Sequence, residues 1–155
     1  MSFESLLQVS PYSLDRMGKE KLLTDRLAEL TEFHRRNCPE YADILNTMSF
    51  EERKISSYKE IPFIPVRLFK ELSLKSVPDG DIVKIMTSSG TSGQSVSRIY
   101  LDRTTASNQQ KAMVKIVSDF TGSGRMPMLI LDCPGVVKNR TMFSARGAGI
   151  LGFSI

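Results

Sequence analysis

A run of small hydroxyl and glycine residues is the part of this sequence best suited to chemistry. It extends from Thr87 to Gly93, reads TSSGTSG, and lies between two apolar stretches, DIVKIM and SRIYLD. Glycines let a backbone come close to an anion, successive N–H groups of such a loop form a nest for negative charge, and hydroxyls add donors without bulk. The residue types and their spacing therefore predict a loop that binds phosphate.

Two familiar loop motifs do not fit this run. A nucleotide-binding P-loop needs G-x-x-x-x-G-K-S/T, whereas here the lysine is absent and Gly90 and Gly93 are too close together. A serine-hydrolase elbow needs G-x-S-x-G, and the single histidine, His34, offers no convincing base. A surface hairpin that binds nothing has the same composition, so this interpretation stays open.

The second half of the chain contains the elements that would position the loop. Alternation over residues 82–86 and β-branched or aromatic residues over 97–102 predict two flanking strands. An amphipathic helix is predicted over 104–120, and the apolar run PMLILD at 127–132 predicts a buried strand. We therefore expect an α/β fold in which residues 81–155 form a strand, loop, strand, helix and strand, giving a mixed sheet with packed helices.

Residues 1–80 are predicted to be a mainly helical lead-in. A helix over 13–37, with Ser13 as its N-cap, ends before Pro39, because a residue that precedes proline avoids the α region. Pro39 opens a second short helix, and IPFIP at 61–65 predicts a buried, extended connector. The apolar stripe of the first helix is predicted to consist of Leu23, Leu27, Leu30 and His34, which makes His34 a packed residue and not a catalytic one.

The composition indicates one soluble domain. The chain has 155 residues, 41% of them apolar and 25% charged. No window approaches the ~20 apolar residues of a membrane helix, and the N-terminus lacks the features of a signal peptide, so we expect no membrane association and a cytoplasmic location. Cys38 and Cys133 lie far apart without neighbouring metal ligands, which argues against a disulfide or metal site, and Cys133 is expected to be a structural thiol.

The charge is unevenly distributed. Residues 1–80 carry 12 Lys and Arg against 13 Asp and Glu, whereas residues 81–155 carry 9 against 4. This excess favours an anionic partner for the second half. The basic residues are scattered and do not alternate with aromatic residues, so we expect a small phosphorylated ligand and no nucleic acid.

The loop resembles the phosphate-binding signature of the adenylate-forming enzymes, S/T-S/G-G-S/T-S/T-G-x-P-K. Ser88 to Gln94 follow this pattern, but Ser95-Val96-Ser97-Arg98 stands in place of the usual Pro-Lys. Arg98 is the candidate for the missing cation, since a guanidinium binds phosphate in bidentate fashion. The resemblance implies that ATP, with Mg²⁺, is bound by Thr87, Ser88, Ser89, Gly90, Thr91, Ser92, Gly93 and Arg98.

The whole chain resembles the LuxE acyl-protein synthetases, which belong to the bacterial fatty-acid reductase complex of bioluminescence. The segments that carry the resemblance are, in order, FHRRNCPEY, IPFIPVRLFK, TSSGTSGQSVSRIYLD and LILDCPG. It implies part of the large N-terminal domain of an adenylate-forming ligase. A carboxylic acid, such as a long-chain fatty acid, would be activated as acyl-AMP and passed to the thiol of an acyl-carrying or reductase protein. It assigns no catalytic residue or metal ligand within these residues.

Other elements of adenylate-forming enzymes do not follow the loop here. An aromatic-Gly-x-Thr-Glu loop, a ribose-binding aspartate and a late lysine are missing, and the sequence ends on the apolar run ARGAGILGFSI. We therefore expect residues 1–155 to be a single domain or N-terminal subdomain of a longer protein, inactive in adenylation on its own. Two alternatives stay open: a non-catalytic nucleotide- or anion-binding module, and a related ligase for another acid in polysaccharide or envelope biosynthesis.

Overall fold

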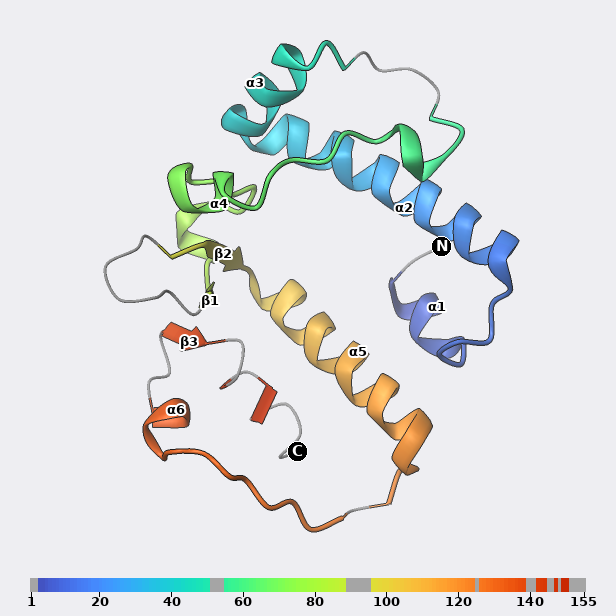
Figure 1. Cartoon of the computed structure of the whole chain (residues 1–155), viewed down its shortest axis with the longest axis vertical. Coiled ribbons are helices and arrows are strands. Elements are labelled where there is room, and N and C mark those ends of the chain that lie inside the picture. Colours follow the sequence, from blue (N-terminus) through green and yellow to red (C-terminus); the bar gives the residue numbers. More distant parts are fainter. Residues whose placement is uncertain are drawn as a thin grey trace.

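The structure of the chain is a computed structural model that describes residues 3–50, 55–88, 96–124, 126–138, 142–144, 147, 149 and 150. Its helices are α1 (Phe3–Gln8), α2 (Arg16–Asn37), α3 (Pro39–Thr47), α4 (Leu68–Glu71), α5 (Arg103–Thr121) and α6 (Gly135–Lys138), with 3-10 turns η1 (Tyr58–Glu60) and η2 (Asp79–Asp81). The strands are β1 (Lys84–Thr87), β2 (Arg98–Leu101) and β3 (Met142–Ser144) (Figure 1). The predicted α/β class is confirmed.

The three described strands form a mixed sheet in the order β2-β1-β3. β1 pairs with β2 in antiparallel fashion, with Lys84 opposite Leu101 and Thr87 opposite Arg98. β3 pairs with β1 in parallel. The two strands predicted on either side of the run TSSGTSG are thus confirmed, and they pair with each other.

Helix α5 starts directly after β2, because Asp102 caps its N-terminus. The carboxylate of Asp102 accepts a hydrogen bond from the backbone N–H of Thr105 at 2.6 Å. Hydrogen bonds from the Thr105 side chain and backbone lower the pKa of Asp102, as expected for a carboxylate held at a helix N-terminus. The helix ends at Gly122, whose φ of 77° lies in the left-handed region that glycine adopts without strain. The predicted helix over 104–120 is confirmed.

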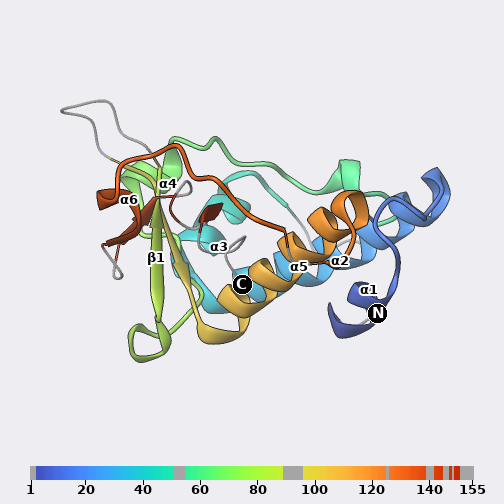
Figure 2. The same ribbon diagram turned by 90° about the horizontal axis from the view of Figure 1, so that it is seen from below.

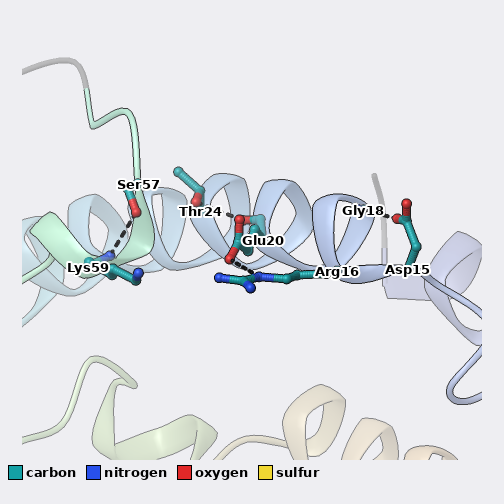
Figure 3. A network of polar contacts seen from close by, with 7 residues as sticks. All are labelled: Asp15, Arg16, Gly18, Glu20, Thr24, Ser57 and Lys59. Carbon is teal, nitrogen blue, oxygen red and sulfur yellow. Dashed lines mark hydrogen bonds and ion pairs between the residues drawn. The ribbon is translucent and has the colours of Figure 1, made fainter.

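Helix α2 begins later than the sequence pattern predicts, because its N-cap is Asp15 and not Ser13. The Asp15 carboxylate accepts a hydrogen bond from Gly18 N–H at 2.8 Å (Figure 3). The Ser13 hydroxyl instead donates to the carbonyl of Ser10 at 2.6 Å. Both residue types are good N-caps, but the carboxylate is also attracted by the positive end of the helix dipole.

The buried side of α2 is formed by threonines and not by the predicted leucine stripe. Thr24 and Thr31 are 9% and 7% exposed, whereas Leu23 is 46% exposed. The Thr24 hydroxyl donates to the Glu20 carbonyl at 2.8 Å and accepts from the N–H of Tyr58 at 2.9 Å, so it ties η1 to α2. Periodicity located an amphipathic helix but could not show which side would meet another segment.

Two other apolar stretches are more exposed than predicted. The run at 127–132 lies outside the described strands, with Leu129 and Leu131 85% and 90% exposed. In the connector at 61–65, Phe63 is 87% exposed. Both expectations of burial were wrong, because a local apolar pattern does not guarantee a covering layer. The accessible surface of 11512 Å² exceeds the roughly 7,900 Å² expected for a compact protein of this mass.

The two long helices extend from the sheet toward the N-terminal part of the chain. In both views α5 leads away from β2, and α1 lies near the start of α2 and beside α5 (Figures 1 and 2). Contacts between α1 and α5, and between α2 and α3, hold these elements together. The sheet lies at one end of the molecule, and α1 lies toward the other end (Figures 1 and 2).

The bond between Thr24 and Tyr58 can be tested by substitution. Thr24→Val keeps the shape of the side chain but removes the acceptor of the Tyr58 N–H, so we expect a loss of about 1–2 kcal/mol in the free energy of unfolding. Thr31→Val is the matched control, because its hydroxyl donates only to the Leu27 carbonyl of its own helix. Urea denaturation followed by circular dichroism measures both, and equal losses would contradict a tie between η1 and α2.

Candidate functional site

The base of the predicted phosphate loop is closed by two serines. Ser88 follows β1, and its backbone N–H donates to the carbonyl of Ser97 at 3.2 Å. In return, the backbone N–H of Ser97 donates to the hydroxyl of Ser88 at 3.1 Å. These bonds continue the pairing of β1 and β2 by one step, to Ser88 and Ser97.

The predicted site residues divide into two groups. Thr87 ends β1, Ser88 lies at the base of the loop, and Arg98 begins β2. The structure brings these three together through the antiparallel register. The other five lie outside the described residues, and their binding role stays a prediction; they are Ser89, Gly90, Thr91, Ser92 and Gly93.

Arg98 stands in a position that suits the predicted cation. It is directly opposite Thr87, and residues directly opposite each other in an antiparallel pair direct their side chains to the same face of the sheet. Arg98 is exposed, and its guanidinium makes no ion pair or hydrogen bond with any other part of the chain that the structure describes. An uncommitted guanidinium at the base of the loop can bind the oxygens of an anion.

Ser97 is a feature of the site that the sequence did not single out. The residue is 7% exposed, and its buried hydroxyl has no hydrogen-bond partner among the described residues. A buried hydroxyl without a partner is costly, and such groups in native structures call for an explanation such as a bound ligand. The sequence marks Ser97 only by its position just after the loop, and other hydroxyl residues also lie near the loop.

The groups at the base of the loop suit phosphate better than a bare metal ion. Asp102 is the nearest acidic residue along β2, and it is already engaged as the N-cap of α5. Within the described ranges, no group of three or more His, Cys, Asp and Glu residues could hold a metal ion.

His34 belongs to a different part of the molecule. Its Nδ1 atom lies 2.7 Å from the Ser76 hydroxyl, and its ring meets those of Phe33 and Tyr41 edge-on. Partial desolvation lowers the pKa of its imidazole below the ordinary value of 6.5. These partners lie in α2, in α3 and in the segment before η2. None of them lies in the hairpin that β1 and β2 form. His34 is exposed as a residue, so the prediction that it packs on the apolar stripe of the helix was wrong, although its ring contacts Phe33 and Tyr41.

The two cysteines are free thiols in different surroundings. Cys38 is 2% exposed, and its thiol donates to the Glu40 carboxylate at 3.6 Å. Cys133 is exposed, which disagrees with the prediction of a structural thiol, because structural thiols are usually buried. The expectation that the two would not form a disulfide is confirmed. The error at Cys133 has the same cause as the error at 127–132, since the run that precedes it is not covered.

A search of the described helices found none that is both long and apolar enough to cross a membrane.

Comparison with protein-family models gives a match to the family described as acyl-protein synthetase, LuxE, over residues 3–153. The match includes α1 to α5, the sheet and the loop between β1 and β2. A search of curated proteins and a search of solved structures each gave no match.

The base of the loop gives a paired test of stability. Ser88→Ala removes the acceptor of a buried N–H, so we expect it to lower the free energy of unfolding by about 1–2 kcal/mol. Ser97→Ala removes a buried hydroxyl that has no partner in the described structure, so it should be neutral or stabilising. Urea denaturation without ligand measures both variants. A larger loss from Ser97→Ala than from Ser88→Ala would contradict the bonding described for this base.

The sole histidine gives a pH test. The lowered pKa means that the unfolded chain binds a proton at His34 more readily than the folded chain does. The resulting stability is fully present above the ordinary pKa of 6.5 and is lost as pH falls toward the lowered folded value. We expect urea midpoints to drop between about pH 7.5 and about pH 5.5, and to drop less in His34→Gln. The same drop in both proteins would contradict this assignment.

Proposed function

We propose that this chain, which belongs to the LuxE acyl-protein synthetase family, takes part in ATP-dependent activation of a carboxylic acid. Family membership supports an acyl-protein ligase, which has an acyl substrate and a protein acceptor. The proposal goes beyond family membership in three respects. They are the use of ATP with Mg²⁺, the acyl-adenylate intermediate and the place among the adenylate-forming enzymes. They rest on the loop from Thr87 to Gly93 and on Arg98.

The proposed reaction has two steps. In the first, a carboxylate oxygen of the acid attacks the α-phosphorus of ATP, a new P–O bond forms, and the bond to the departing pyrophosphate breaks. In the second, the thiolate of an acceptor protein attacks the acyl carbonyl carbon, a thioester forms, and AMP leaves with the electrons of the broken C–O bond. The thiol proton goes to solvent. No residue described here is assigned to the second step.

The hairpin supplies the first step with a place for the phosphates. The backbone N–H groups and hydroxyls of residues 87–93 would hold the phosphates that depart, and Arg98 would balance the charge that develops on them. The single observation that carries this proposal is the register that places Arg98 opposite Thr87, one step along the strands from the bonded pair Ser88 and Ser97. Donors held in place before the reaction need no reorganisation during it.

The substrate and the acceptor are proposed by class. A fatty acid is the first candidate for the carboxylic acid, with an acid of polysaccharide or envelope biosynthesis as the alternative. The acceptor would be an acyl-carrying or reductase protein in the cytoplasm.

Arg98 gives the direct test of ATP binding. Isothermal titration of Mg-ATP onto wild-type and Arg98→Ala chains should show a loss of affinity of about tenfold to a hundredfold, the range of a charge-assisted bond. Lys111→Ala is the control, since Lys111 is exposed on α5, away from the hairpin. Equal affinity in wild type and Arg98→Ala would contradict the assignment.

A further inference from the structure

An extended apolar segment lies between α5 and α6. Residues 126–131 read MPMLIL, carry no charged side chain and belong to no helix or strand of the described structure. Figure 1 shows the stretch that joins the two helices at the periphery of the molecule, away from α2 and α3. A run of exposed apolar residues is uncommon on the surface of a soluble protein, and such patches mark interaction sites.

The backbone of this segment is free to pair with another strand. None of the N–H or C=O groups of residues 126–131 forms a hydrogen bond with another residue that the structure describes. The first such bond after the segment runs from Cys133 N–H to the Asp132 carboxylate at 2.7 Å. An extended apolar backbone with unpaired N–H and C=O groups is a template for strand pairing.

The side chains of the segment alternate in exposure with the period of a β-strand. Leu129 and Leu131 are 85% and 90% exposed, whereas Met128 and Ile130 are each 44% exposed. Successive side chains of an extended chain point to opposite faces. One face of the segment is therefore partly covered by its own chain, and the face with Leu129 and Leu131 lies in water.

The segment is complementary to a second copy of itself. When two copies are aligned in antiparallel fashion about Leu129, Leu129 lies opposite its own counterpart, and Pro127 lies opposite Leu131 of the second copy. With Leu129 at a non-hydrogen-bonded pair, Pro127 also falls at such a pair, where the backbone nitrogen points away from the partner strand. This is a position in which a strand tolerates proline, because no N–H is needed there.

The same register favours the side chains as well as the backbone. Non-hydrogen-bonded pairs bring opposite side chains closest together, so the exposed face of each copy would be covered by that of the other. Met128 and Ile130 fall at hydrogen-bonded pairs, where the two copies exchange N–H and C=O bonds. Asp132 lies opposite Met126, so no like charges meet directly across the two segments.

The chain exposes enough surface for an interface of this kind. Its accessible surface of 11512 Å² exceeds the roughly 7,900 Å² expected for a compact protein of this mass. The excess is several times the ~800 Å² that each partner contributes to a standard stable interface. Association that removes apolar surface from water is favourable in proportion to the area covered.

We propose that residues 126–132 form an interface between two copies of this chain, in which the two segments pair as antiparallel strands about Leu129. The exposed leucines of each copy are covered by the other, and the unpaired backbone groups gain partners. The proposal goes beyond the function proposed above, since no residue of the β1–β2 hairpin takes part and no ATP is needed.

The test is sedimentation equilibrium of the chain and its variants without nucleotide, over a wide range of protein concentration. We expect wild type to dimerise reversibly and Leu129→Lys to weaken the dimer at least about tenfold, because two ammonium groups would replace the leucine pair. Phe63→Lys is the matched control, since Phe63 is 87% exposed but lies outside the segment.

A mixture of two variants tests the register itself. Leu129→Lys and Leu129→Glu should each dimerise poorly alone, but an equimolar mixture should recover association, because opposite charges would then face each other. A mixture that associates no better than its components would overturn the register.

Three other results would overturn the proposal: a wild type that stays monomeric at all concentrations, open-ended association beyond two copies, or an equal loss in Phe63→Lys. Circular dichroism checks that each variant is folded. Protection of the amides of residues 126–131 from hydrogen exchange in a monomeric wild type would show that another part of the same chain covers the segment.

Discussion

The candidate site depends on the antiparallel pairing of β1 with β2. The register sets Thr87 opposite Arg98 and extends to Ser88 and Ser97. A slip of one residue would turn every side chain of β2 to the other face of the sheet, and it would move Arg98 away from the loop. Leu101 resists such a slip because it is 3% exposed at the other end of the same strand. One buried leucine therefore helps to hold the proposed phosphate site in place.

The rest of the fold rests on a small core and on single polar ties between distant segments. The buried apolar residues among those described are Cys38, Leu45 and Leu101. Thr24 ties η1 to α2, His34 contacts Ser76, and Ser10 bonds to Asp119. Each ion pair along α2, such as Arg16 with Glu20 in Figure 3, joins residues one turn apart and has at least one well-exposed partner, so each contributes little to stability. Loss of one of these hydrogen bonds should therefore weaken the attachment of a whole segment.

Local sequence patterns predicted the strands and helices around the candidate site better than they predicted which side chains are buried. The strands on either side of the loop, the helix after Asp102 and the short helix opened by Pro39 were all predictable, because turn residues, caps and proline act within a few residues. The threonine side of α2 and the exposed run at 127–132 were not, because burial depends on which segments meet in space. Ser97 was missed for a related reason: its burial and its unpartnered hydroxyl are tertiary facts.

The chemistry of the β1–β2 hairpin suits one kind of ligand. The hairpin offers N–H groups, hydroxyls and one guanidinium, which suit phosphate oxygens. The central claim concerns the hairpin, and backbone amide NMR tests it most directly. On titration with pyrophosphate, the account predicts saturable shifts concentrated at residues 87–98, and saturable shifts elsewhere, or none, would contradict it.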